Sequence, residues 1–405
     1  MDLSFYSNFG NTLAAQEAQI NTLQQQISSG LKVQTPDQNP AAYETAALGN
    51  EQISQLTNDN TTQAAIQTQL GAANNAYSST TTLLDNVQSI VLQALNGTAN
   101  AQNLNALSTQ VQSASRQLLS IGNTIAPNGS YLFSGSRGTL APFQPDTSGN
   151  IAYFGDAGQG QATVGQGETS NTLVTGEVFT SALAGDGTST VAANSGNNGS
   201  GQVLQQGLVN ANAANAFQQG NAAITLSFAV SGNTTTYTAT QGGTTLSTGT
   251  LTSNGTSQTS LQLAGVDYEI TGSPANGDSF TISPSRPQSA FALLQQISTA
   301  LANAGSTPAQ VAQTNQVLNQ SLAGLAQYQQ AVTTAQAQNG VTLQALSTAA
   351  TGNTSQQTEV QTTVDNATAV DMPAAISALD QTMTALEAAM KTFGTVQSLS
   401  LFNYL

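Results

Sequence analysis

Apolar residues in the N-terminal third of the chain recur at spacings that alternate between three and four. One run covers residues 104–125, and an earlier run repeats every seven residues from Leu70 to Val91. Sustained heptads are typical of helices that pack side by side in a coiled coil or a long bundle. The segment Asn96–Asn100 separates the two runs and contains a glycine, which favours a turn. The pattern therefore predicts a helical hairpin over residues 46–135.

The C-terminal third repeats this pattern. A row of residues at seven-residue spacing begins at Val311, and a second run of alternating spacing ends at Phe393. The seven-residue spacing and the alternating spacing of three and four residues are both typical of helices. We therefore expect returning helices over residues 290–365 and a further helix, available for subunit assembly, over residues 366–405.

A polar residue interrupts the C-terminal apolar row. Asn339 falls where the seven-residue spacing calls for an apolar side chain, and Gly340 follows it. A buried asparagine in such a row can specify the register of paired helices at a cost in stability. The alternative is a local break of the row at a bend, which a glycine permits. The sequence leaves both interpretations open.

Between residues 136 and 289 the helical spacing disappears, and glycine, threonine, serine and asparagine dominate. Five short segments alternate instead between apolar and polar residues, as half-buried strands do, and turn sequences such as Gly242-Gly243 separate some of them. The predicted strands cover residues 223–230, 236–240, 259–263, 266–270 and 280–282. The stretch 185–201, made almost entirely of small residues, is expected to form a mobile loop.

The order of helices, strands and helices predicts an α+β fold. Each helical end carries an apolar row that is unfavourable in water, so the two ends are expected to pack together. We therefore expect long N- and C-terminal helices packed as a coiled-coil-like rod, with an outward-facing β-rich domain inserted over residues 136–289.

The outermost residues of the chain are unusually apolar. Domain ends are usually polar and poorly ordered, because little compensates the entropy lost in ordering them. We expect residues 1–45 to be largely disordered in the free subunit and both ends to fold against neighbouring subunits during assembly. The residues predicted to form this subunit interface are Leu3, Phe5, Tyr6, Phe9, Ile20, Leu23, Ile27, Leu31, Leu386, Met390, Phe393, Leu399, Leu401, Phe402, Tyr404 and Leu405.

Charge narrows the choice of partners. Only 6% of the residues are charged, with 5 basic against 20 acidic ones, which gives a net charge of -15. Such scattered basic residues form no patch for a nucleic acid or an anionic membrane, and neither is expected as a partner. No basic, apolar secretory signal is visible in the sequence. We expect a chain that is cytosolic or exported without a cleaved signal peptide.

Candidate chemistry is sparse. The chain has no cysteine and no histidine, so it lacks thiolate nucleophiles, disulfides and the usual general base. Asp146 begins a polar alternation like that of a calcium loop, but the glycine and glutamate of that loop are absent, which favours a plain turn. The glycine-rich segment 155–160 lacks the lysine of a phosphate-binding loop. Asp267 and Glu269 share one face of a predicted strand. The sequence therefore predicts no enzyme, no metal site and no cofactor.

Residues 23–48, LQQQISSGLKVQTPDQNPAAYETAAL, resemble the N-terminal signature of the flagellin superfamily. In that signature a helix is followed by Ser-Ser-Gly, a basic residue and a turn like Asp-Asp-Pro. The matching residues are Ser28, Ser29, Gly30, Lys32, Thr35, Pro36 and Pro40. Within the superfamily, the chain is similar to the hook–filament junction proteins in four places. These are YLFSG (131–135), YFGD (153–156), GSPANGDSFTISPSRPQSAF (272–291) and SLSLFNYL (398–405).

The resemblance implies a structural protein of the bacterial flagellum that lies outside the cell, where it joins the hook to the filament. It implies export through the flagellar type III apparatus without a cleaved signal peptide. The implied partners are further copies of the chain, the hook-side junction protein, flagellin and a flagellar export chaperone. Filament flagellin is one alternative. An alternative of another class is a ligand-binding or enzymatic β domain on a helical stalk.

Overall fold

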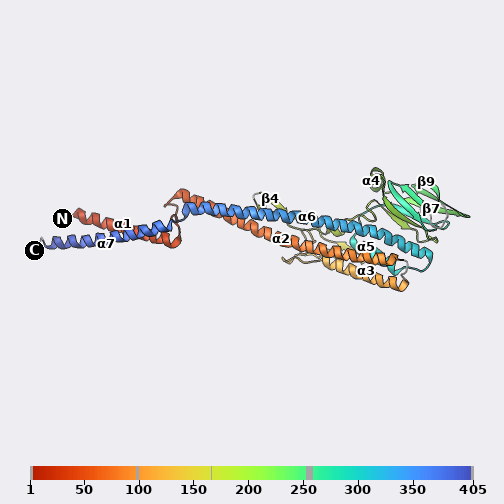
Figure 1. Cartoon of the computed structure of the whole chain (residues 1–405), viewed down its shortest axis with the longest axis horizontal. Coiled ribbons are helices and arrows are strands. Elements are labelled where there is room, and N and C mark those ends of the chain that lie inside the picture. Colours follow the sequence, from red (N-terminus) through yellow and green to blue (C-terminus); the bar gives the residue numbers. More distant parts are fainter. Residues whose placement is uncertain (1–2, 97–99, 166, 252–258, 403–405) are drawn as a thin grey trace. The chain divides into compact units, whose positions relative to one another are not determined.

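The computed structural model describes residues 3–96, 100–165, 167–251 and 259–402. Long helices occupy both outer parts of the chain, and strands lie between them (Figure 1). The α-helices are α1 (Leu3–Ser29), α2 (Pro40–Leu95), α3 (Ala101–Gly122), α4 (Ala211–Gln219), α5 (Ala290–Ala302), α6 (Pro308–Thr368) and α7 (Met372–Phe402). A short 3₁₀-helix, η1, covers Gly176–Phe179. The α+β class expected from the sequence is therefore confirmed.

The strands of the described residues form two hairpins and two larger sheets. The five-stranded sheet has the order β5-β12-β7-β8-β9, and the three-stranded sheet has the order β10-β11-β6. All neighbours in these two sheets are antiparallel. The hairpins are β1 (Phe143–Pro145) with β2 (Ile151–Tyr153), and β3 (Gln161–Gly165) with β4 (Glu168–Asn171). The remaining strands are β5 (Ser189–Ala193), β6 (Gln202–Leu208), β7 (Ile224–Ser231), β8 (Thr234–Gln241), β9 (Thr244–Leu251), β10 (Thr259–Leu263), β11 (Val266–Thr271) and β12 (Ser279–Pro284).

The chain divides into two compact units. The first comprises residues 1–63, 164–167 and 347–405, as far as they are described, and the second comprises residues 64–163 and 168–346. The division falls within α2 and α6, so each of these helices contributes to both units. The segment limits expected from the sequence, at residues 45, 135, 289 and 365, remain predictions.

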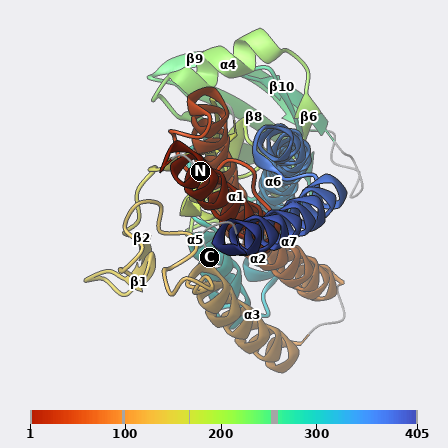
Figure 2. The same cartoon turned by 90° about the vertical axis from the view of Figure 1, so that its left-hand side faces the viewer.

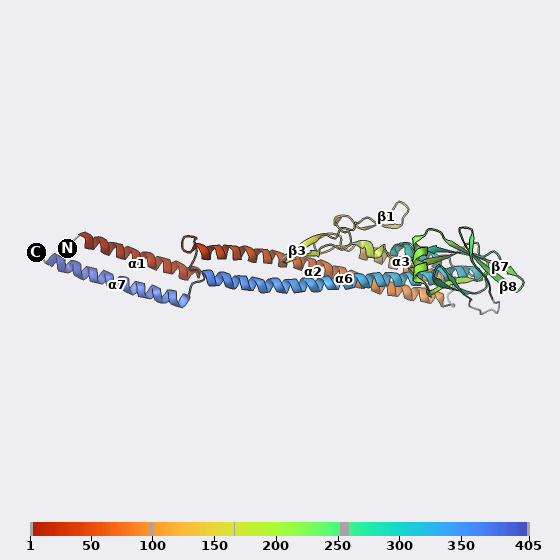
Figure 3. The same ribbon diagram turned by 90° about the horizontal axis from the view of Figure 1, so that it is seen from above.

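In the first unit, α1 and α7 lie side by side and run in opposite directions (Figures 1 and 3). Gly30 ends α1, because its φ of 74° is a left-handed conformation that glycine adopts without steric cost. Beyond it, the Lys32 N–H donates to the Thr368 carbonyl at 2.7 Å and the Val370 N–H donates to the Gly30 carbonyl at 2.9 Å. These two bonds join the end of α1 to the segment between α6 and α7.

The start of α2 follows from the sequence Asn39-Pro40. Proline suits the first helical position, where no N–H partner is needed. The Asn39 side chain accepts a hydrogen bond from the Ala42 N–H at 3.2 Å, as an N-cap residue does. The Gly30 and Pro40 of the flagellin-like signature therefore stop one helix and begin the next.

The end of β3 is held to α2 and α6 in the first unit. The Val164 carbonyl accepts hydrogen bonds from the side-chain amides of both Gln63 and Asn353. Asn353 also donates to the Asn60 side chain at 3.2 Å. Val164 and Gln63 are buried, so the two amides satisfy a carbonyl that solvent does not reach.

In the second unit, the apolar rows read from the sequence form the buried seam of α2 and α6. Their buried members are Leu70, Tyr77, Leu84 and Val91 of α2, and Leu318, Leu325, Val332 and Leu346 of α6. Burial of each large apolar side chain contributes about 1.5–3 kcal/mol. Helix α3 packs against α5 in the same unit, and the Ser108 hydroxyl donates to the Ser298 carbonyl at 2.8 Å.

Asn339 is half-buried in this unit and pairs with α2. Its side-chain amide donates to the Asn74 side chain at 3.3 Å. Helix α6 continues through Gly340 without interruption. Of the two interpretations that the sequence left open, the structure supports a polar pair between helices, and it shows no break of α6 at this position.

The larger sheets of the second unit enclose a core of their own. Strand residues that alternate inward, including Val203, Leu226, Val266 and Ile282, are fully buried there. Figure 2, seen along the helices, separates these sheets and α4 from the β1–β2 hairpin. The five predicted strands correspond to β7, β8, β10, β11 and β12.

The expectation of a mobile loop over residues 185–201 is wrong. Residues 189–193 form β5, which pairs with β12 through Val191 and Ile282. Two carboxylates hold the flanking turns: Asp186 accepts from the Thr188 and Ser189 N–H groups, and Asp278 accepts from the Asn198 and Gly199 N–H groups. Gly185 and Gly199 lie so close to neighbouring backbone that a side chain would not fit, which composition alone does not reveal.

None of the helices, over the residues that the structure describes, has an apolar stretch long enough to cross a membrane.

Candidate functional site

The predicted subunit interface lies mainly on α1 and α7. Phe9 and Phe393 bring the two helices together, because their rings are stacked with centroids 4.4 Å apart and planes 8° apart. Offset or stacked aromatic pairs of this kind add about 0.5–1.5 kcal/mol beyond their burial. The candidates that are half-buried are Phe9, Ile20, Leu23, Ile27, Leu386 and Phe393.

Helix α7 carries two apolar rows, each with a seven-residue spacing. Leu379, Leu386 and Phe393 are half-buried. The other row is exposed: Ile376, Met383 and Met390 have 46%, 45% and 48% of their surface open to solvent. A partner helix can pack on such a row, because heptad spacing keeps it on one face.

Ile376 and Met383 are absent from the interface residues predicted at the chain ends. The alternating spacing that identified α7 contains both of them, so the signal was present in the sequence. Of the remaining candidates, Leu31 is 39% exposed at the end of α1. The side chains of Leu3, Phe5, Tyr6, Leu399, Leu401 and Phe402, and the residues Tyr404 and Leu405, lie outside what the structure describes.

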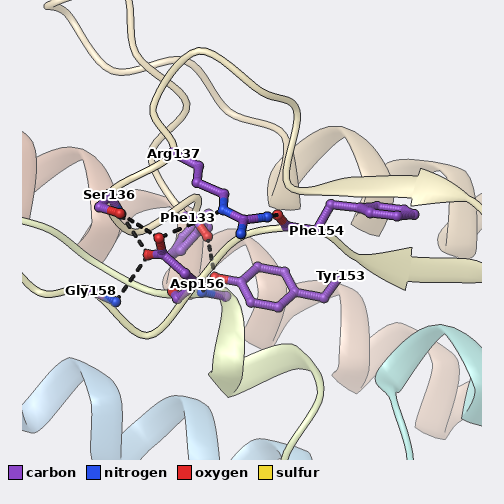
Figure 4. Close-up of polar contacts among 8 residues, drawn as sticks. Phe133, Ser136, Arg137, Tyr153, Phe154, Asp156 and Gly158 are labelled. Atoms are coloured by element: carbon purple, nitrogen blue, oxygen red, sulfur yellow. Dashed lines mark hydrogen bonds and ion pairs between the residues drawn. The ribbon is translucent and has the colours of Figure 1, made fainter.

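In the second unit, the structure brings together the motifs YLFSG and YFGD, which lie twenty residues apart in the sequence (Figure 4). The Tyr153 hydroxyl lies 3.0 Å from the Phe133 carbonyl, 3.1 Å from the Asp156 carbonyl and 3.0 Å from the Gly176 N–H, which donates to it. The Asp156 N–H donates to the Ser134 carbonyl at 3.2 Å. One tyrosine hydroxyl therefore joins two loop segments and the start of η1.

The Asp156 carboxylate closes the same junction. It accepts hydrogen bonds from the Ser136 N–H at 2.7 Å, from the Ser136 hydroxyl and from the Gly158 N–H at 3.0 Å. The Arg137 guanidinium lies 3.8 Å from it and is itself exposed (Figure 4). The hydrogen bonds from Ser136, with smaller contributions from Gly158 and Arg137, hold the pKa of the Asp156 carboxyl below its ordinary value of 3.8.

Aromatic side chains pack against this junction. Phe133 contacts Tyr77 of α2 and Phe179 of η1, and Phe143 contacts Phe179 and Phe291 of α5. Burial raises the pKa of Tyr77 and Tyr153, so both phenols remain protonated near neutral pH. The junction is a packing and hydrogen-bonding device, and its tyrosines are not poised to exchange protons.

Glutamines of α6 attach the larger sheets to the helices of the second unit. Gln313, Gln316, Gln320 and Gln327 recur at spacings of three, four and seven, which places them on one face of the helix. Gln313 donates to the Asn194 and Asn197 carbonyls, Gln320 accepts from the Val191 N–H, and Gln327 donates to the Asp186 carbonyl. This function was not predicted from the sequence, although the spacing of these residues is visible there.

Acidic groups of the described residues offer no cluster of three that could hold a metal ion. The Asp146 carboxylate, considered for a calcium loop, accepts hydrogen bonds from the Ser148 and Asn150 N–H groups of its own turn. Asp267 and Glu269 are half-buried, and each accepts a hydrogen bond from a neighbouring strand, from Ser260 and Gln206 respectively. These carboxylates hold turns and strands.

The known proteins that this chain is similar to are flagellar proteins. The model of the bacterial flagellin N-terminal helical region matches residues 3–138. Flagellar hook-associated protein 3 of Escherichia coli is 28% identical over 122 residues, which are 30% of this chain and 38% of that protein. The chain thus spans well under half the length of this curated relative.

Two solved structures have a similar fold. FlgL of Xanthomonas campestris matches with a TM-score of 0.69 and 25% identity, over 78% of this chain and 99% of that one. The flagellar junction protein FlgL of Legionella pneumophila matches with a TM-score of 0.68 and 23% identity, over 80% of this chain and 100% of that one. The resemblance seen in the sequence is therefore confirmed: the chain carries the flagellin N-terminal helical region over residues 3–138 and has the fold of the FlgL structures.

Proposed function

We propose that this chain is a structural component of the bacterial flagellum and joins the hook to the filament. The names of its relatives, flagellar hook-associated protein 3 and flagellar junction protein, support this assignment. The proposal gives the chain no catalytic role. Its place of action is the extracellular flagellum.

The observation that carries the proposal is the exposed row Ile376, Met383 and Met390 on α7. Exposed apolar side chains aligned on one helix face are typical of a surface that another molecule covers. The row belongs to a helix that already pairs with α1 through its other row. A helix of a neighbouring subunit would therefore complete a bundle of at least three helices.

The partners follow from this interface. Further copies of the chain, the hook-side junction protein and flagellin would each supply a helix to the α1–α7 pair. The interface residues predicted from the sequence on α1 and α7, from Leu3 to Leu31 and from Leu386 to Leu405, are part of this proposal. Contacts between unlike surfaces of neighbouring copies do not close within a pair of copies, so they suit a ring or a helical assembly.

Export belongs to the same proposal. The chain would leave the cell through the flagellar export apparatus without a cleaved signal peptide. An export chaperone would cover the apolar row of α7 beforehand, since an exposed apolar helix face favours association in the cytosol.

A deletion strain complemented with variants tests the function. The triple variant Ile376→Ser, Met383→Ser, Met390→Ser should fold, because substitutions at exposed positions change stability by only about 0.5 kcal/mol each. It should nevertheless leave hooks without filaments and release flagellin into the medium. The matched control is Ala374→Ser, Gln381→Ser, Ala388→Ser, three exposed positions of the same helix with the same spacing but on another face.

Filament flagellin remains the second candidate, because the matching N-terminal region is the one named for flagellin. The deletion strain separates the two functions. Loss of a junction protein should leave bare hooks and secreted flagellin, whereas loss of flagellin should leave no flagellin in the medium. Normal filaments and swimming in the triple variant would refute the interface assignment.

A further inference from the structure

A groove of about 810 Å³ lies in the second unit, and none of its lining residues belongs to α1 or α7. Four elements line it: the turn between β1 and β2, α3, α5 and the first part of α6. Its volume falls within the range of about 300–1,000 Å³ that small-molecule sites occupy. The proposed assembly function does not use this groove.

The lining of the groove combines polar and apolar surface and carries no charged side chain. Its carboxamide side chains are Asn150, Gln295, Gln296, Asn303, Gln310 and Gln313. Serine and threonine hydroxyls lie between them, and Ile151 and Val317 supply apolar surface. A carboxamide both donates and accepts hydrogen bonds, so this surface suits a ligand whose groups do the same.

Several of these polar groups are available for a ligand. The side chains of Asn150, Gln295, Thr299 and Asn303 have no hydrogen-bond partner within the described part of the chain. Asn150, Gln295, Thr299 and Asn303 are also exposed. They come from the β1–β2 turn, from α5 and from the residue that caps the C-terminal end of α5, all of which line the same groove.

The walls of the groove are already held in place. The Asp146 carboxylate accepts from the Ser148 and Asn150 N–H groups, and Gly149, with a φ of 84°, completes this turn. On the helical side, Gln296 accepts from the Gln288 amide at 2.8 Å. A site that is formed before binding loses little entropy when a ligand enters.

The base of the β1–β2 hairpin is fixed as well. Asn123, at the end of α3, makes two hydrogen bonds with the Phe143 backbone: its amide donates to the carbonyl at 2.8 Å, and its carbonyl accepts from the N–H at 3.0 Å. The Phe143 ring packs on Phe291, a lining residue. The turn therefore stays beside the groove.

From this arrangement we infer that the groove binds a neutral oligosaccharide of two or three sugar units. Sugar hydroxyls donate and accept at once and match the carboxamides, while the C–H faces of the sugars match the half-buried Ile151 and Val317. Anionic ligands do not fit, because no basic side chain lines the groove and the chain carries a net charge of -15. A peptide fits less well, because the groove offers no continuous apolar floor.

Saturation-transfer difference NMR on the full chain tests the inference, with maltotriose, cellotriose and tri-N-acetylchitotriose as the neutral probes and trigalacturonate as the anionic one. At least one neutral trisaccharide should bind saturably with a Kd of about 1 mM or tighter, and trigalacturonate should not bind. The double variant Gln295→Ala, Asn303→Ala should weaken binding about tenfold or more.

Gln110→Ala on α3 is the matched control, since Gln110 is exposed and does not line the groove. It should bind as the parent does, and circular dichroism should show the helix content of all variants unchanged. Absence of saturable binding for all three neutral probes would overturn the inference. So would equal binding by the double variant or by trigalacturonate.

Discussion

The side chain of Gln316 pairs with the backbone of Val203 as a neighbouring strand would. The Val203 N–H donates to the Gln316 side-chain carbonyl at 2.8 Å, and the Gln316 amide donates to the Val203 carbonyl at 2.7 Å. Both residues are buried. A helix side chain therefore caps the edge of β6, which would otherwise leave a buried N–H and carbonyl unsatisfied.

Gln316→Leu should remove this support at almost constant volume. It leaves both backbone groups of Val203 without a partner, so we expect a loss of about 2–4 kcal/mol in the free energy of unfolding. Urea unfolding followed by circular dichroism measures it. Gln330→Leu, at an exposed position of the same helix, is the control and should change stability by less than about 0.5 kcal/mol. Equal midpoints for the two variants would contradict the assigned role of Gln316.

Gly135→Ala should strain the junction between the two loop motifs. Gly135 has a φ of 63°, and a Cβ there would collide with the Asp156 carbonyl and carboxylate. We expect a loss of about 1–3 kcal/mol in the free energy of unfolding. Gly129→Ala is a matched control, because Gly129 has a φ of 83° but open space around it, so it should lose only about 1 kcal/mol. If the two losses are equal, the close contact between residue 135 and Asp156 does not determine the loss in the free energy of unfolding.

The stabilising effect of Asp156 should depend on pH. Its pKa in the folded chain is lowered below 3.8, chiefly by the Ser136 hydrogen bonds, so its charged form favours folding. This contribution is present above the unfolded pKa and is lost as the pH falls through the lower, folded pKa. Asp156→Asn should therefore be less stable than the parent near neutral pH, and the difference should shrink below about pH 4. Urea midpoints across this range provide the test, and a difference that is independent of pH would argue against a role for the charge.

The pair Asn74 and Asn339 should fix the register of α2 and α6. Replacing both with leucine should raise the free energy of unfolding by up to about 1 kcal/mol, since a polar pair in an apolar seam costs stability. It should also allow slipped pairing. Because the chain has no cysteine, oxidation of an engineered pair reports register directly. Ser78→Cys with Gln336→Cys reads the native register, in which the two side chains are hydrogen-bonded at 3.1 Å.

The slipped register is read by Ser78→Cys with Gln329→Cys, one heptad away. The double leucine variant should form more of this crosslink than the parent. No change in either crosslink would favour the view that Asn339 is merely a polar interruption of the row.

The expected disorder of the chain ends in the free subunit remains a prediction. The α1–α7 pair buries few side chains. None of the described side chains of α1 is buried, and Ala375 is the one buried side chain described in α7. Such a pair opens at low free-energy cost. Limited proteolysis of the free subunit should therefore remove about 40 residues from each end before it cuts the second unit. Equal resistance of α1, α7 and the second unit would show that assembly is not needed to order the ends.

Local periodicity was enough to predict the long helices α2, α3, α6 and α7 and five of the twelve strands among the described residues. Leu70, Tyr77, Leu84 and Val91 repeat every seven residues, and this spacing alone places them on one buried face. Gly30 and Pro40 likewise act through their own backbone geometry, so their effect on α1 and α2 is visible in the sequence. The exposed row on α7 is likewise visible in the sequence, as a seven-residue spacing of apolar residues.

Contacts between distant residues were decided only by the tertiary structure. Strand β5 is made of small residues that give no pattern, and it exists because Val191 pairs with Ile282 and Asp186 and Asp278 hold its flanks. The partner of Gln316 lies 113 residues away, and the free energy of that bond depends on burial that no local spacing encodes. The sequence by itself therefore determined which residues face inward along each helix, while the long-range hydrogen bonds, and with them the attachment of the β insert, depended on the folded chain.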